Sequence, residues 1–123
     1  SCVYSCPELA CTGLTEEAAQ RVGKAYDVGV FPLAANGRAL IMNGGNGVIK
    51  VLVGKTHREI LGVYIYGPRA TDLISEACLA VGMEATSDEV LATIHGHPTL
   101  GEALREAVLA AEGRAVHLPP AKE

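Results

Sequence analysis

The sequence VIKVLVGKTHREILGVYIY, residues 48–66, contains two apolar runs separated by a polar connection. The runs at 48–53 and 60–66 are rich in β-branched and aromatic side chains, and this composition predicts two strands joined as a hairpin. A third, alternating run lies at 26–31. Together the three runs predict an antiparallel meander with one face left for helices to cover.

Helix signals surround this meander. A threonine followed by two glutamates at 15–17 is typical of a helix N-terminus. Apolar residues recur at helical spacing over 73–81, and Thr-x-x-Glu patterns at 86–89 and 99–102 match capping boxes. Because strands come first and helices last, the sequence predicts a single α+β domain.

Four other segments are predicted to lack long regular structure. Pro7 indicates a turn after a short strand at 2–4, and Asn36-Gly37-Arg38 indicates a break in the chain. The cluster at 43–47 predicts a loop with positive φ angles, because a strand rather than a helix follows it and a phosphate cradle would need the helix. Residues 113–123 are predicted to form an extended tail that is poorly ordered alone.

The composition limits the classes of protein to which the chain can belong. A length of 123 residues is typical of one domain. The net charge of −4 argues against a nucleic-acid-binding surface, which needs clustered lysine and arginine. No run of about eighteen apolar residues is present, so no membrane span is expected. The chain starts at Ser1 rather than at methionine, which suggests a processed product or an excised domain.

Four cysteines, Cys2, Cys6, Cys11 and Cys78, raise the question of disulfides. The apolar content of 49% is enough for a core without crosslinks, so we expect reduced thiols in an intracellular protein. Cys6 and Cys11 have the C-x4-C spacing of a flavoenzyme redox disulfide, but unlinked thiols are the favoured interpretation. No histidine follows these cysteines at zinc-finger spacing, so no metal site is predicted.

The stretch HGHPTLGE, residues 95–102, concentrates the side chains best suited to catalysis. His97 and Glu102 flank the predicted start of the last helix, close enough for the carboxylate to reach the imidazole. A histidine oriented by an acid is the arrangement that general acid–base catalysis requires. We therefore predict that His97 and Glu102 form an acid–base pair.

Structural interpretations of the same stretch stay open. Glu102 is the third residue after Thr99 and would complete a capping box without any catalytic role. His95 is equally explained as a core or surface histidine, and His97 as the residue that sets the turn before Pro98. The chain has no G-x-G-x-x-G motif, P-loop or serine elbow. If His97 is catalytic, the groups on which it acts come from another domain or another chain.

Several blocks of sequence, in order along residues 2–112, match a known family at its own spacing. They are YSCPELA at 4–10, GLTE at 13–16, FPLAANGRA at 31–39, GVIKV at 47–51, ILGV at 60–63, GP at 67–68, EA at 76–77 and HGHPTLGEAL at 95–104. On these blocks the chain resembles the C-terminal interface (dimerisation) domain of the FAD- and NAD-linked pyridine nucleotide-disulfide oxidoreductases, and among them most closely the dihydrolipoyl dehydrogenases.

This resemblance implies an antiparallel sheet with helices packed on one face, and a division into an interface domain at 1–112 and a tail at 113–123. It implies a homodimer in which His97 and Pro98 of one subunit reach the flavin and redox disulfide of the other. His97 would take a proton from dihydrolipoamide, and Glu102 would orient its imidazole. FAD and NAD would be bound mainly by other domains of the complete enzyme, so the isolated chain is expected to bind no cofactor and to be inactive.

The resemblance also implies partners and a compartment. The partners would be lipoyl domains of 2-oxo acid dehydrogenase complexes or the H-protein of glycine cleavage, in the cytoplasm or, in a eukaryote, the mitochondrial matrix. Departures at Thr12, Gly37 and Gly96 leave the subfamily open. The alternatives are a dimerisation module without activity, the same domain of a glutathione-type or coenzyme A disulfide reductase, and a thiol- or metal-binding protein that uses the N-terminal cysteines.

Overall fold

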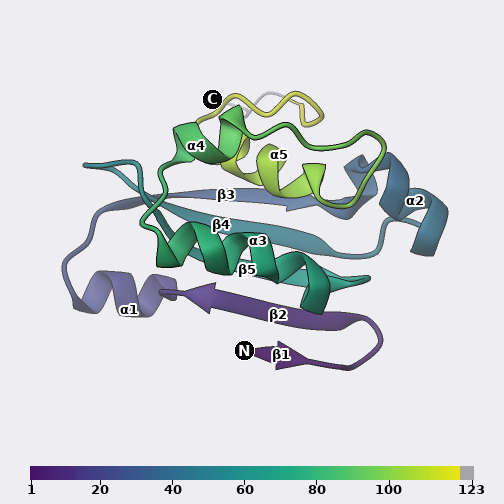
Figure 1. Cartoon of the computed structure of the whole chain (residues 1–123), viewed down its shortest axis with the longest axis horizontal. Coiled ribbons are helices and arrows are strands. Elements are labelled where there is room, and N and C mark those ends of the chain that lie inside the picture. Colours follow the sequence, from purple (N-terminus) through teal and green to yellow (C-terminus); the bar gives the residue numbers. More distant parts are fainter. Residues whose placement is uncertain (120–123) are drawn as a thin grey trace.

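The computed structural model describes residues 1–119. The chain forms one five-stranded sheet in which every neighbouring pair of strands is antiparallel (Figure 1). In spatial order the strands are β1 (Cys2–Val3), β2 (Glu8–Gly13), β5 (Ile60–Gly67), β4 (Val48–Gly54) and β3 (Tyr26–Pro32). β3, β4 and β5 are neighbours in sequence and in space, which confirms the predicted meander.

The central hairpin of β4 and β5 supplies apolar side chains to the main core on one face of the sheet. Val51 pairs with Val63 and Ile49 pairs with Ile65, and all four side chains are buried in the main core. A register shift after Leu52 interrupts the ladder near the hairpin loop. The alternation of strand side chains therefore places one continuous apolar surface under the helices.

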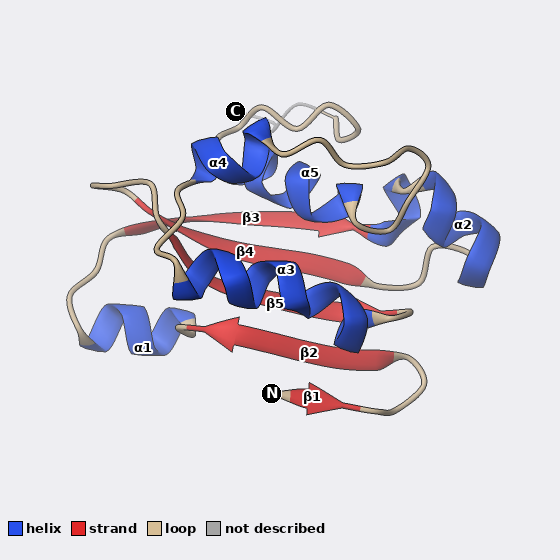
Figure 2. Ribbon diagram, in the orientation of Figure 1, coloured by secondary structure: helices blue, strands red, loops and turns tan. Residues whose placement is uncertain are grey.

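Two helices cover that surface. α3 (Ala70–Gly82) packs over β2 and β5, and α5 (Glu102–Ala111) packs over β3 and β4. Figure 2 shows both helices lying along the same face of the sheet, with α4 (Ser87–Ala92) between them in the chain. At one corner of the opposite face, α1 (Glu16–Arg21) buries Ala19 beside Leu52 and Leu61.

The predicted caps of α1 and α4 are confirmed. The Thr15 hydroxyl oxygen accepts a hydrogen bond from the Ala18 N–H at 2.9 Å. At α4, the backbone N–H of Thr86 donates to the Glu89 carboxylate at 2.7 Å. The Thr86 hydroxyl also binds this carboxylate, and these two hydrogen bonds hold the pKa of Glu89 below its ordinary value.

Residues 8–13 form β2, although the sequence indicated only a turn there. This segment contains Glu, Ala and Gly, which are depleted in strands. Its pairing with β5 decides the structure: Ala10 lies opposite Ile65 and is fully buried. A contact with a partner more than fifty positions away leaves little local signal.

Residues 36–43 were also predicted wrongly, as a break followed by an apolar stretch. Asn36 is in fact the N-cap of α2 (Gly37–Asn43), which follows the short 3-10 helix η1 (Leu33–Ala35). The Asn36 side-chain oxygen accepts from the Ala39 N–H at 2.9 Å. Gly44 ends the helix with φ of 70°, as predicted for this glycine cluster.

The described part of the C-terminal tail is held against α5. The buried Glu106 carboxylate accepts hydrogen bonds from the backbone N–H groups of Val116 and His117 at 3.1 and 3.0 Å. Leu118 packs against the main core. This part of the tail forms no helix or strand, and its poor order stays a prediction. Residues 120–123 lie outside the described residues. The domain boundary at residue 112 stays a prediction.

Within residues 1–119, no helix has the length and apolar character that crossing a membrane would require.

Candidate active site

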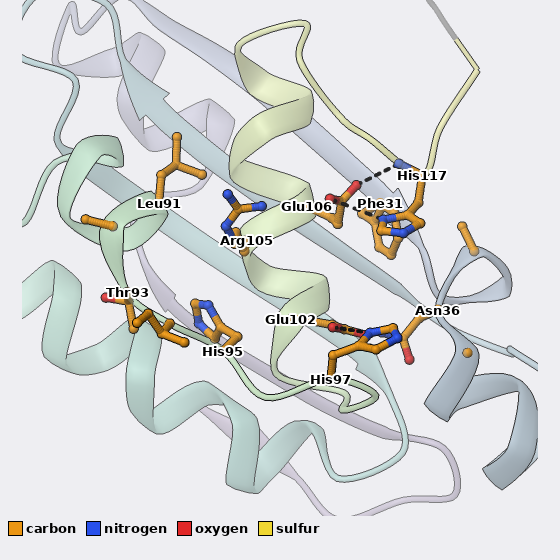
Figure 3. Close-up of a pocket in the computed structure, with 14 residues that line it drawn as sticks. Phe31, Asn36, Leu91, Thr93, His95, His97, Glu102, Arg105, Glu106 and His117 are labelled. Carbon is orange, nitrogen blue, oxygen red and sulfur yellow. Dashed lines mark hydrogen bonds and ion pairs between the residues drawn. The ribbon is translucent and has the colours of Figure 1, made fainter.

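The stretch that was predicted to be catalytic forms the connection between α4 and α5 (Figure 3). His95 and His97 occupy this connection, but their side chains lie in different surroundings. The His97 side chain is 75% exposed, whereas that of His95 is 8% exposed. Only His97 is therefore open to a group that approaches from outside the chain.

His97 and Glu102 form the predicted pair. The His97 Nδ1 lies 2.9 Å from Glu102 Oε2 and 3.2 Å from Oε1. Because a carboxylate only accepts hydrogen bonds, Nδ1 carries the proton in this arrangement and Nε2 of the neutral ring is left as a free base. Glu102 is the first residue of α5, where the helix dipole also favours a negative charge. The geometry is that of a histidine oriented for proton transfer.

The alternative interpretation of Glu102 as part of a capping box is wrong. α5 begins at Glu102 itself, and the preceding residue, Gly101, makes no side-chain cap. The Thr99 hydroxyl instead donates to the Gly96 carbonyl oxygen at 2.6 Å. Since the helix starts two residues later than the pattern predicted, the Glu102 carboxylate is free to bind His97.

The His95 side chain forms its hydrogen bond with α3 rather than with α5. Its Nε2 lies 2.7 Å from the Glu76 Oε1, and its Nδ1 is buried without a hydrogen-bond partner among residues 1–119. The interpretation of His95 as a core histidine agrees with this burial. In Figure 3 the His95 ring lies toward Thr93, while His97 lies beside Glu102.

A pocket of about 470 Å³ opens between the α4–α5 connection, α5 and the tail. It is lined by both histidines of the connection and by four ionisable side chains from α5 and the tail, Glu102, Arg105, Glu106 and His117. The pair of Glu106 and His117 was not predicted; the Glu106 Oε1 and the His117 Nδ1 lie 3.3 Å apart. One signal was available for Glu106, because it follows Glu102 by four positions and so shares its helix face.

The described residues supply no thiol at this pocket. All four cysteines are free, and none of them lines it. Across residues 1–119 there is also no group of three or more histidine, cysteine, aspartate or glutamate side chains placed to hold a metal ion. His97 and Glu102 can hold and move a proton, but within the described part of the chain they have no thiol to act on.

The pattern that defines the dimerisation domain of the pyridine nucleotide-disulphide oxidoreductases matches residues 1–108. The chain belongs to this family. It is 48% identical over 116 residues to the dihydrolipoyl dehydrogenase of Bacillus subtilis, covering 94% of this chain and 24% of that protein. The dihydrolipoyl dehydrogenase of Thermus scotoductus is 48% identical over 118 residues, or 96% of this chain and 26% of that protein. The chain thus spans about a quarter of the length of these relatives.

Solved structures of the family confirm the predicted fold. The dimerisation domain is similar to part of the flavoprotein disulfide reductase RclA of Escherichia coli, with a TM-score of 0.83 and 27% identity over 88% of this chain and 25% of that one. It is similar to part of LpdA of Mycobacterium tuberculosis, with a TM-score of 0.82 and 25% identity over 88% of this chain and 24% of that one. The sequence resemblance to the family's dimerisation domain is therefore confirmed.

Proposed function

We propose that this chain is the dimerisation domain of a dihydrolipoyl dehydrogenase and that it supplies an acid–base pair to the active site of its twofold partner. One observation carries the proposal: Glu102 fixes His97 by its Nδ1, while the rest of the imidazole is exposed and meets no thiol of the described chain. Such a pair is half of a site. The names of the relatives, with which the chain shares 40–48% identity, support the choice of reaction.

The pair suits the oxidation of a dithiol. Thiol–disulfide exchange requires a thiolate, so a base that removes the proton of the substrate thiol accelerates the first step. In our proposal the His97 Nε2 takes this proton, and the thiolate sulfur attacks one sulfur of the redox disulfide of the partner subunit. The S–S bond breaks, a mixed disulfide forms and a cysteine thiolate leaves. The second substrate thiol gives its proton to the cysteine thiolate that has left, and its sulfur then attacks the substrate sulfur of the mixed disulfide. This closes the lipoamide disulfide and releases the other cysteine as a thiolate.

Glu102 has two roles in this scheme. Its carboxylate holds the Nδ1 proton, which keeps Nε2 directed outward and basic. When His97 is protonated, the same carboxylate faces the imidazolium and stabilises its charge. Glu102 is only 20% exposed, so water screens this interaction less than it would on an open surface.

FAD and NAD belong to this proposal as cofactors of the complete enzyme. The His97–Pro98 segment fits one wall of a flavin site, because both residues are exposed to a neighbouring molecule. When bound, FAD would accept the electron pair of the reduced disulfide and NAD would receive it as hydride. The described residues offer no glycine-rich turn that would hold the phosphates of either cofactor, so we place their binding mainly outside this chain.

The family's dimerisation domain supports a homodimer as the assembly. We further propose that the substrate dithiol is carried by lipoyl domains of 2-oxo acid dehydrogenase complexes or by the H-protein of glycine cleavage. The compartment would be that of these complexes, the cytoplasm in a bacterium or the mitochondrial matrix in a eukaryote.

The substrate class is tested with the full-length product of the reading frame that encodes this chain. We expect that product to reduce NAD with dihydrolipoamide, and not to oxidise NADPH with oxidised glutathione or coenzyme A disulfide. The 123-residue chain alone serves as the control and should show neither turnover nor flavin absorbance. Reduction of glutathione or coenzyme A disulfide without activity on dihydrolipoamide would instead assign the chain to those reductases.

A further inference from the structure

We propose that Asn36 is a positioning residue that fixes the His97 loop, residues 96–99, through the carbonyl group of Thr99. This inference rests on the proposed function of His97 and names a residue through which the site is built. The Asn36 Nδ2 donates a hydrogen bond to the Thr99 carbonyl oxygen at 2.9 Å, across 63 positions of sequence. Asn36 is 3% exposed, so this contact is shielded from competing water.

The Asn36 side chain uses both ends of its amide. Its oxygen caps α2 by accepting from the Ala39 N–H at 2.9 Å, and its nitrogen reaches the His97 loop. The backbone N–H of Asn36 donates to the Leu33 carbonyl oxygen at 2.9 Å, which closes the 3-10 turn η1 that directly follows β3. The loop is thereby connected to the start of α2 through a buried side chain that makes two hydrogen bonds.

The loop that Asn36 holds is short and otherwise exposed. The Thr99 hydroxyl donates to the Gly96 carbonyl oxygen at 2.6 Å, which closes the loop across His97 and Pro98. Its other end is fixed by the buried His95, whose Nε2 lies 2.7 Å from the Glu76 carboxylate. His97 therefore sits between two fixed points, one provided by α3 and the other by Asn36.

Loss of either contact, His95 to Glu76 or Asn36 to Thr99, would change the position of the His97 imidazole. Glu102 reaches His97 from α5, and its hydrogen bond to Nδ1 requires the loop to stay within bonding distance of the helix start. Figure 3 shows Asn36 on the same side of the pocket as His97 and Glu102. A displaced loop would leave His97 present but poorly aligned with both Glu102 and the substrate thiol.

Two substitutions separate the loop contact from the helix cap. Asn36→Asp keeps an oxygen that accepts from Ala39 but places a second oxygen against the Thr99 carbonyl. Asn36→Ser also keeps a capping oxygen, adds no charge and is too short to reach Thr99. The matched control is Asn43→Asp, at the other end of α2, where the Asn43 Nδ2 donates to the Asn46 carbonyl oxygen in an exposed loop.

Steady-state kinetics of the full-length product with dihydrolipoamide give the first readout. We expect Asn36→Asp and Asn36→Ser to lower kcat by about tenfold to a hundredfold, the scale of a misplaced catalytic group, with KM nearly unchanged. Asn43→Asp should leave both constants as they are. If the Asn36 variants keep kcat within about twofold while His97→Ala loses it, this inference is wrong and the proposed function stands.

The second readout is independent of activity. Long-range ¹H–¹⁵N NMR spectra of the 123-residue chain report which nitrogen of the neutral His97 ring carries the proton. We expect the proton on Nδ1 in the parent chain and in Asn43→Asp, and a mixture of tautomers in Asn36→Ser. An unchanged His97 tautomer in a folded Asn36→Ser chain would overturn the positioning role. A change in tautomer without any effect of His97→Ala on turnover would instead contradict the proposed function.

Discussion

Replacing His97 with alanine is expected to lower the rate of dihydrolipoamide oxidation by the full-length product by about a hundredfold or more, as for the loss of a general base. The proposed role of Nε2 is to remove the proton from the substrate thiol. The pocket also holds a second imidazole–carboxylate pair, His117 with Glu106, but its Nδ1–Oε1 distance is 3.3 Å, against 2.9 Å for His97 and Glu102, and its imidazole is less exposed, at 56% against 75%. The measurement is kcat/KM with dihydrolipoamide and NAD, compared with NADH oxidation by an artificial electron acceptor that needs no thiol chemistry.

Glu102→Gln is the companion to this variant. The amide oxygen can still accept from the His97 Nδ1, but the negative charge that stabilises the imidazolium is gone, so we expect a smaller loss than for His97→Ala. Since Glu102 does not close a capping box, helix capping should not contribute to the effect. If His97→Ala left dithiol oxidation untouched and only weakened dimers, His97 would have a structural role alone.

Gly29→Ala is expected to destabilise the chain by about 1–3 kcal/mol, the range for overpacking a core. Gly29 lies on β3 beneath α5, and a Cβ there would stand 1.9 Å from the Ala107 carbonyl oxygen and 2.6 Å from the Ala111 nitrogen. Both are backbone atoms, so no rotamer change relieves the clash and α5 has to move away from the sheet. The free energy of unfolding in urea measures the effect on the 123-residue chain.

Gly82→Ala provides the control for this prediction. Gly82 is the last residue of α3, and a Cβ there meets no atom within 4 Å. The same change of residue should then be neutral or stabilise the helix by up to about 1 kcal/mol. Equal losses of stability at the two positions would contradict close contact between β3 and α5. Because Glu102 begins α5, Gly29→Ala should also reduce dithiol oxidation in the full-length product.

The meander was predictable because its strands carry their signal locally. Residues 48–53 and 60–66 combine strand-forming composition with a polar hairpin connection, so no distant contact is needed to identify them. Thr15 and the Thr86–Glu89 pair likewise mark helix starts within four residues. β2 carries no such signal, since its strand state depends on pairing with β5.

The candidate site was only partly predictable for a similar reason. The pattern from Thr99 to Glu102 is compatible with two structures, a capping box and a carboxylate bound to His97. The residue at which α5 begins determines which of the two forms. Contacts between residues that are distant in the sequence produce no local sequence pattern from which they could be predicted. The hydrogen bond from Asn36 to Thr99 and the packing of the tail on Glu106 both depend on the assembled fold.

Hybrid dimers test whether His97 of one subunit acts on the redox disulfide of the other. One subunit would carry His97→Ala, and the other would carry serine in place of the cysteines of the redox disulfide, with different affinity tags for purification. Each parent homodimer should be inactive with dihydrolipoamide. If His97 acts in trans, the hybrid contains one complete site and oxidises dihydrolipoamide. A hybrid dimer as inactive as its parents would show that His97 does not act on the partner's disulfide and would contradict the proposal.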